Sequence, residues 1–192
     1  MAPRPPDPDK HEAILEAALD LFVERGFHGT AVPEVAERAG VGAGTIYRYF
    51  ESKEALVNAV YQRSKREFLE YVLADFPFIA PAREQLHVFW TRMAEQTRDN
   101  FRAMAFMELH HHGAYLDEQS RALESSLLDT TREIMTRWRA EQVVKDVDPD
   151  LLVAIVWGAF VGIQKAAWLG HLELTDEALA EAEECVWQAI RR

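Results

Sequence analysis

Three histidines stand side by side, His110, His111 and His112, and neutral imidazole is a common ligand of transition metals. Adjacent residues of a helix point about 100° apart, so these three side chains cannot share one ion on a regular helix. Glu108 shares a helix face with His111 or His112, which supplies at most two ligands locally. Gly113 indicates a helix end, where imidazoles meet the negative end of the helix dipole. We therefore expect no metal and no cofactor. We expect His110 to face a pocket because it lies three and four residues after Met107 and Phe106.

A second group of candidate residues lies at 42–50. The segment begins with Gly42–Gly44, three small residues that would let a helix enter a DNA major groove. The polar and aromatic side chains that follow are Thr45, Tyr47, Arg48 and Tyr49. They offer hydrogen-bond donors, one fixed cation and stacking surface, whereas Ile46 and Phe50 lie four residues apart and are expected to anchor the inner side. Simpler roles remain open, because Thr45 can cap the helix, Arg48 can be a solvated surface residue and Tyr49 can pack in the core.

The elements that must position these residues are helices. Apolar residues recur every three or four positions along the chain, capping residues and glycines divide them, and we predict an all-α fold of about nine helices. Two short helices, at about 32–39 and 44–50, are joined by a glycine turn at 40–42. With the preceding helix, which should end at Gly26, they predict a three-helix domain containing a helix-turn-helix. A longer helix follows from Lys53 to about Asp75.

This N-terminal region resembles a known family. The stretch ILEAALDLFVERGFHGTAVPEVAERAGVGAGTIYRYFESKEALVNAVY is similar to the DNA-binding domain of the TetR (tetracycline-repressor-like) family of bacterial transcription regulators, over about residues 11–61. The resemblance implies a homodimer that binds a palindromic operator on double-stranded DNA and is released by a small-molecule effector. Carried onto this chain, it implies the following DNA-binding residues: Thr30, Gly44, Thr45, Tyr47, Arg48, Tyr49 and Lys53. Thr30 and Lys53 match phosphate contacts at helix N-termini.

Three positions depart from the family pattern. A serine or threonine is usual where Ala31 stands, a serine where Gly42 stands, and often a lysine where Ala43 stands. These departures leave fewer groups for phosphate contact and favour, to a small degree, a helical ligand-binding or interaction protein with weak or lost DNA binding. They also shift the expected phosphate contacts onto Arg48, Lys53 and the tail residues Arg4 and Lys10.

Charge is distributed unevenly along the 192 residues, whose net charge is −11. Residues 1–66 hold 9 Lys and Arg against 10 Asp and Glu, whereas residues 67–192 hold 12 against 22. Phosphate contact depends on the local potential, so the overall charge does not exclude DNA. A single cysteine, Cys185, falls in an apolar stripe and should be buried. The chain shows neither a signal peptide nor an apolar run of about 20 residues, so we expect a cytoplasmic protein with no membrane partner.

The C-terminal two thirds are rich in aromatic residues and methionine, which suit an apolar cavity between helices, although any one of them can be an ordinary core residue. The residues expected to bind an effector are Trp90, Met93, Met104, Met107, His110, Trp138, Trp157, Gln164 and Trp168. No nucleophile elbow, P-loop or dinucleotide-binding motif is present, so we do not expect an enzyme.

The last two predicted helices have the pattern of a subunit interface. The first carries small residues that allow close helix approach, and the second carries one apolar stripe, so two copies can form a four-helix interface. The residues expected there are Ile155, Gly158, Ala159, Gly162, Ile163, Leu179, Ala182, Val186 and Ile190. The alternative is that both helices pack only within one chain. We thus predict a disordered tail at 1–10, a DNA-binding domain at 11–55, and a ligand-binding and dimerisation domain at 56–192.

Overall fold

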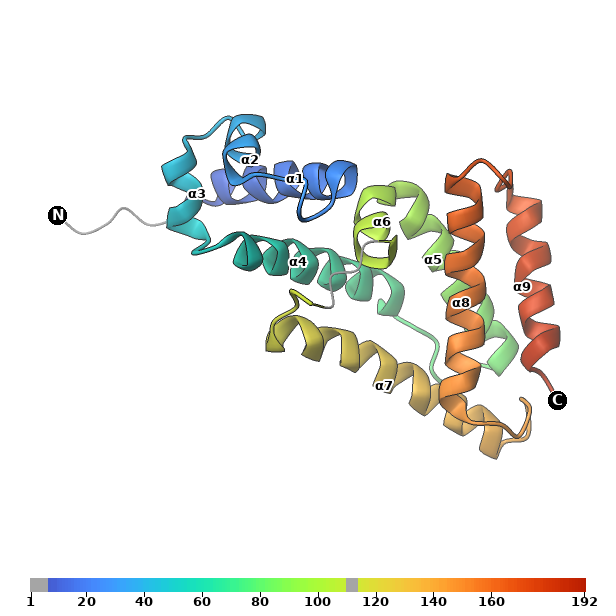
Figure 1. The fold of residues 1–192 in the computed structure, drawn as a ribbon. Helices are drawn as coiled ribbons and strands as arrows, with labels where there is room; N and C mark the ends of the chain where they lie inside the picture. Colours follow the sequence, from blue (N-terminus) through green and yellow to red (C-terminus); the bar gives the residue numbers. More distant parts are fainter. Residues whose placement is uncertain (1–6, 110–113) are drawn as a thin grey trace. The chain divides into compact units, whose positions relative to one another are not determined.

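The computed structural model describes residues 7–109 and 114–192, and within them all regular structure is α-helical (Figure 1). The helices are α1 (Pro8–Arg25), α2 (Val32–Arg38), α3 (Ala43–Tyr49), α4 (Lys53–Leu73), α5 (Ala82–Asp99), α6 (Phe101–Leu109), α7 (Glu118–Ala140), α8 (Pro149–Trp168) and α9 (Asp176–Ile190). The predicted all-α fold is therefore confirmed. Residues 8–10, which we expected in a disordered tail, instead form the first turn of α1, and His110 lies outside the described residues.

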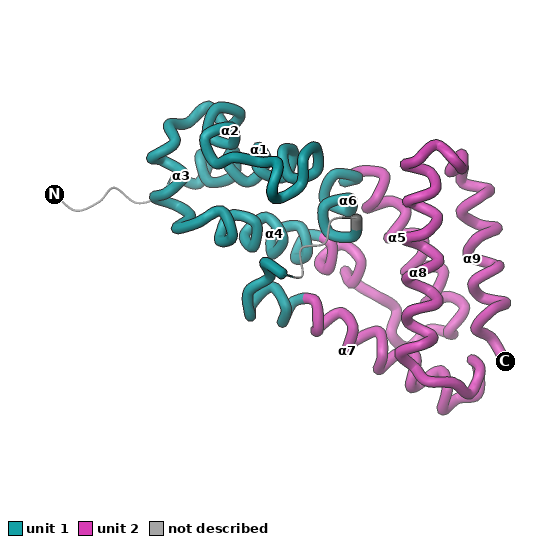
Figure 2. The backbone as a smooth tube through the Cα atoms, viewed as in Figure 1, with its two compact units in different colours: residues 1–67, 100–123 teal, residues 68–99, 124–192 magenta. Residues whose placement is uncertain are grey.

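The chain divides into two compact units that do not follow a single cut in the sequence (Figure 2). Unit 1 contains residues 1–67 and 100–123, and unit 2 contains residues 68–99 and 124–192. Helix α6 and the first turn of α7 thus belong to the same compact unit as the helix-turn-helix. The sequence placed everything after residue 55 in one domain, whereas packing assigns 56–67 and 100–123 to the N-terminal unit.

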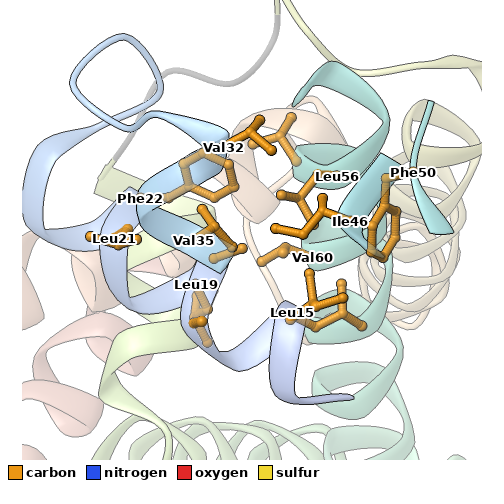
Figure 3. Packing of buried hydrophobic residues seen from close by; sticks show 14 of the residues in the cluster. Leu15, Leu19, Leu21, Phe22, Val32, Val35, Ile46, Phe50, Leu56 and Val60 are labelled. Atoms are coloured by element: carbon orange, nitrogen blue, oxygen red, sulfur yellow. The ribbon is translucent and has the colours of Figure 1, made fainter. Parts of the chain in front are cut away.

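Unit 1 is built around the apolar face of α1. Asp7 caps this helix by accepting a hydrogen bond from the Asp9 amide, Pro8 occupies the first turn, and Gly26 ends it at φ 69°. One row of its side chains, including Leu15 and Phe22, packs against apolar residues of α2, α3 and α4 (Figure 3). Burial of this cluster packs the three N-terminal helices against α4, and this packing fixes the position of α3.

Unit 2 contains α5, α8 and α9, packed through a mixture of apolar and polar contacts. The indole of Trp90 on α5 lies edge-on to Phe160 of α8, with ring centroids 5.3 Å apart, and its Nε1 donates to the Leu179 carbonyl oxygen at 3.0 Å. Glu183 of α9 is buried and pairs with Arg83 and with His87 Nδ1, the latter at 2.9 Å. These contacts bind α9 firmly to its own chain.

Candidate DNA-binding surface and subunit interface

The turn between α2 and α3 has the geometry that a helix-turn-helix needs. Gly40 adopts φ 65°, a left-handed conformation that costs other residues about 1–2 kcal/mol. The Val41 amide then donates to the Ala36 carbonyl oxygen at 2.9 Å, and α3 begins after Gly42. Ile46 is 1% exposed and Phe50 is also buried, so these two residues anchor the inner side of α3. The inner face expected from their spacing is the one observed.

The outer face of α3 presents the residues that the sequence selected for base contact. Tyr47 is 56% exposed and Arg48 is exposed. A methyl group built on Gly44 meets no heavy atom of the described chain within 4 Å beyond its two neighbours and the backbone of its own helix. Thr45 is half-buried near the start of the helix. Arg48 forms no ion pair with any residue in 7–109 or 114–192. Its guanidinium is thus available to an acceptor from outside the chain.

Tyr49 differs from its neighbours because its hydroxyl already has partners. The hydroxyl accepts from the Asp7 amide at 2.8 Å and donates to the Asp7 carbonyl oxygen at 3.1 Å. Its ring lies 5.9 Å from that of His11 and 6.4 Å from that of Phe50. Tyr49 therefore joins α3 to the start of α1, and any contact of its hydroxyl with DNA would compete with this bridge.

Thr30 has to be removed from the predicted phosphate contacts. Its side chain is buried, with 3% of the residue exposed. The hydroxyl lies 3.0 Å from the Leu21 carbonyl oxygen and 2.9 Å from that of Gly26, and it donates to these acceptors. This bond closes the turn after α1 and leaves the hydroxyl facing the protein interior. Thr30 matches the family pattern in residue type, but its buried position does not allow the phosphate contact that the resemblance implies.

The start of α2 shows what replaces a capping hydroxyl at Ala31. The Glu34 carboxylate accepts from the Ala31 amide at 3.0 Å and from Arg25 Nη1 at 2.7 Å. The bond from the Ala31 amide is the main reason that the pKa of Glu34 is lowered, and Arg25 lowers it further. Half of a capping box thus survives without a serine or threonine at its first position.

Lys53 occupies the first turn of α4 and is half-buried. Its ammonium lies 4.3 Å from the centroid of the Phe27 ring, a cation–π contact. Burial against this apolar neighbour lowers the pKa of Lys53. By contrast, Arg63 further along α4 pairs with Glu12 and with Glu16, so it does not extend a basic surface.

The residues expected to bind an effector are divided between the two units. Met104 and Met107 lie in unit 1, and the other described members lie in unit 2. Trp90 and Met93 are fully buried, and the indole N–H of Trp90 is already used by the Leu179 carbonyl group. Trp168 is 51% exposed, which differs from the expected cavity lining.

Three further members of this set lie on α7 and α8 of unit 2. Trp138 is buried, and its Nε1 has no hydrogen-bond acceptor among the described residues. Trp157 lies edge-on to Phe68 with centroids 6.0 Å apart, and Gln164 is half-buried. Burial thus accounts for most of the aromatic richness, and a common cavity stays a prediction.

The two helices expected at a subunit interface behave differently. On α8, Ile155 is 37% exposed, Gly158 and Gly162 are exposed, and Ala159 and Ile163 are half-buried. A methyl group built on either glycine meets no heavy atom of the described chain within 4 Å beyond its two neighbours and the backbone of α8 itself. On α8 the predicted interface thus includes three exposed residues, Ile155, Gly158 and Gly162, and pairing through this face stays a prediction.

The α9 part of the interface prediction needs correction. Leu179, Val186 and Ile190 are all buried, and Ala182 is half-buried, because their stripe faces the interior of unit 2. Cys185, expected in that buried stripe, is exposed. Apolar periodicity identified a buried face correctly, but the neighbour that covers it is the chain's own helical core.

Comparison with known proteins agrees with this geometry. Residues 14–60 match the family model described as bacterial regulatory proteins, tetR family, and residues 61–192 match that of a tetracycline-repressor-like C-terminal domain. The transcriptional regulator RutR of Escherichia coli K12 is 31% identical over 159 residues, which cover 78% of this chain and 71% of RutR.

Solved structures give the same fold. A TetR-family regulator from Vibrio parahaemolyticus is 29% identical with a TM-score of 0.76, covering 95% of this chain and 99% of that one. AibR, solved with isovaleryl coenzyme A and operator DNA, has a TM-score of 0.78 at 24% identity. The match covers 93% of this chain and 97% of AibR.

Proposed function

Because the chain belongs to the tetR family of bacterial regulatory proteins and is a DNA-binding transcriptional regulator, we propose that it acts as a homodimeric repressor released by a small effector. The observation that carries this proposal is the outer face of α3. It exposes Tyr47 and Arg48 on a helix whose inner side is fixed by Ile46. Its place of action is then the bacterial cytoplasm, where operator DNA lies.

Within this proposal, Arg48 reads a base and Lys53 contacts a phosphate. An arginine in a major groove donates two parallel hydrogen bonds to guanine O6 and N7, which gives about 1–3 kcal/mol of discrimination against other bases. A lysine at the start of a helix adds its charge to the positive end of the helix dipole. The two cations thus contribute to the free energy of DNA binding in different ways. The contribution of Arg48 depends on base sequence, and that of Lys53 does not.

The proposed dimer forms through the exposed face of α8. By length and composition alone this helix could cross a membrane, and most of its apolar stretch is not buried within the chain. Exposed apolar surface of this kind marks an interaction site. Gly158 and Gly162 lie one turn apart and allow a second helix to approach closely, which favours a second copy of the same face.

A dimer also follows from what one recognition helix can read. One short helix contacts too few base pairs for useful specificity, whereas two related by a two-fold axis double the contacts. They would enter successive major grooves about 34–36 Å apart. An effector would act by favouring a protein state in which the distance between the two recognition helices does not match that between successive major grooves.

A gel shift with the DNA upstream of the protein's own gene tests DNA binding directly. We expect a complex with this duplex that resists competition by a shuffled duplex of the same length and composition. Arg98, an exposed arginine of unit 2 paired with Asp176, provides the control, because Arg98→Ala should bind as the wild type does. Equal competition by the two duplexes would contradict sequence-specific recognition.

Calorimetric titration tests the effector, with isovaleryl coenzyme A as the first probe. Thermodynamic linkage requires that a ligand which releases DNA binds the free protein more tightly than the protein–DNA complex, by a coupling of about 1–3 kcal/mol. Tighter binding to the complex would make the compound a corepressor. Equal binding to both forms would contradict release by this compound.

A further inference from the structure

Residues 114–117, immediately before α7, lie against the turn between α1 and α2 within unit 1. The ring of Tyr115 stacks on that of Phe27, with centroids 4.0 Å apart and planes inclined by 22°. Its hydroxyl lies 2.6 Å from His28 Nε2, a hydrogen-bond distance. One tyrosine thus contacts two successive residues of the turn, by stacking and by a hydrogen bond.

The same phenylalanine ring also carries the ammonium of Lys53. Phe27 is therefore shared between a stacked tyrosine and a cation, with Lys53 Nζ 4.3 Å from its centroid. Phe27 follows Gly26 directly and precedes the buried Thr30, so the turn is short and closed at both ends. Because the ammonium rests over this ring, a shift of the Phe27 ring should move the Lys53 ammonium, which also interacts with the charges of Glu54 and Glu34.

The backbone of Tyr115 is fixed to the helix that bears Lys53. Asn58 of α4 is 5% exposed, and its Nδ2 donates to the Tyr115 carbonyl oxygen at 2.7 Å. Its Oδ1 accepts from the Asp117 amide at 2.8 Å and from the Ser120 hydroxyl at 2.7 Å. The buried amide is satisfied on both sides, so the segment before α7 is held at a defined place on α4.

We propose that Tyr115 is a positioning residue for DNA binding, which holds Phe27 and through it orients the Lys53 ammonium toward the DNA backbone. Tyr115 lies 66 residues beyond Tyr49, the last residue of the helix-turn-helix, inside the segment matched by the C-terminal family model. It touches no DNA itself in this account. The inference rests on the proposed phosphate contact of Lys53, and its test separates the two.

A double-mutant cycle on a random-sequence duplex tests this inference, because a phosphate contact is independent of sequence. Tyr115→Leu keeps apolar volume but removes the stacking ring and the hydroxyl. We expect it to weaken binding about fivefold in the wild-type background, to lower the salt slope toward that of Lys53→Ala, and to have little further effect in the Lys53→Ala background. Tyr115→Phe, which keeps the ring, should restore most of the affinity.

Tyr71→Leu is the matched control, because this tyrosine also has a bonded hydroxyl, to Glu95 at 2.8 Å, but lies in unit 2. It should leave affinity and salt slope unchanged. If Tyr115→Leu does not fold, Phe27→Leu removes the shared ring from the other side and should give the same loss and the same slope.

The possible failures are distinct. Equal losses from Tyr115→Leu with and without Lys53 would overturn the positioning role while leaving the phosphate contact intact. An unchanged salt slope in Lys53→Ala would show that Lys53 contacts no phosphate, and the role of Tyr115 would fall with it. Neither result would affect sequence-specific binding through Arg48, which the upstream duplex tests separately.

Discussion

Helices α3 and α8 have the same organisation with opposite chemistry. In each, one narrow apolar side faces the interior: the single residue Ile46 in α3, and the row Leu152, Val156 and Phe160 in α8. The remaining surface of α3 is polar and cationic at Tyr47 and Arg48. That of α8 is mostly apolar between its exposed charged residues Asp150 and Lys165, with exposed leucine, isoleucine and glycine residues.

This difference identifies the partner that each face suits. A polar, cationic face keeps its hydration when free and exchanges it for phosphate and base edges when bound. An apolar face with small residues gains most by excluding water against a second helix. In both helices the inner row determines folding and the outer face determines association, and substitutions can separate the two.

The largest expected effect is on folding, at the inner row of α3. Ile46→Ala removes a fully buried side chain and should lower the free energy of unfolding by about 2–5 kcal/mol. Tyr47→Ala, one position along on the outer face, should change it by no more than about 0.5 kcal/mol. Urea unfolding followed by circular dichroism measures both. Similar losses in the two variants would mean that α3 has no distinct inner side.

The next effect is on association, at the outer face of α8. Gly162→Leu places a bulky side chain where the chain itself leaves open space, so the monomer should stay folded. In a dimer the same side chain should overpack the interface, at a cost of about 1–3 kcal/mol for each symmetry-related contact. Sedimentation equilibrium should then show a raised dimer dissociation constant, whereas Ala140→Leu at the exposed end of α7 should not raise it. An unchanged constant for Gly162→Leu would exclude this face.

A third effect concerns the outer face of α3. Arg48→Ala should weaken binding to the upstream duplex by about 1–3 kcal/mol and relax preference at one base position. Its unfolding curve should match that of the wild type, because the side chain is exposed. Anisotropy titrations with operator and shuffled duplexes provide the comparison. An equal loss on both duplexes would mean that Arg48 contacts phosphate and not a base.

The smallest effect is a pH dependence at the start of α2, the helix that supports α3. The pKa of Glu34 is lowered in the folded state, chiefly by the Ala31 amide. The carboxylate therefore adds to the free energy of unfolding above the unfolded pKa near 4.5. This contribution is lost as pH falls through the lower, folded pKa. Unfolding of Glu34→Gln should therefore approach that of the wild type in acid, and differ from it at pH 7. A difference in the free energy of unfolding that stays constant with pH would show that the charge of the Glu34 carboxylate is not what stabilises this turn.

Local sequence patterns were sufficient where one helix and its turn determine the outcome. The small residues at 42–44, the spacing of Ile46 and Phe50, and the glycine turn gave the helix-turn-helix and its exposed face correctly. Local patterns failed where a segment distant in sequence determines what covers a residue. The stripe containing Leu179 and Val186 indicated a buried face, but only packing shows that α9 buries it in its own unit.

Polar residues were the harder part of the site for a related reason. Thr30 and Asn58 have the same side-chain chemistry whether buried or exposed, and periodicity carries no information about their partners. Their hydrogen bonds reach carbonyl groups or side chains that are fixed only once the turn after α1 and the segment before α7 are in place. A tyrosine preceded by glycine and alanine gives no signal that it stacks on Phe27.

The most direct test of the account is the stoichiometry and symmetry of the complex with operator DNA. Sedimentation of the complex, together with hydroxyl-radical footprinting, measures both on one duplex. We predict two chains for each operator and two protected half-sites about 34–36 Å apart, related by a two-fold axis. A single chain bound to an asymmetric footprint would contradict the pairing of α8 faces and the reading of DNA by two α3 helices.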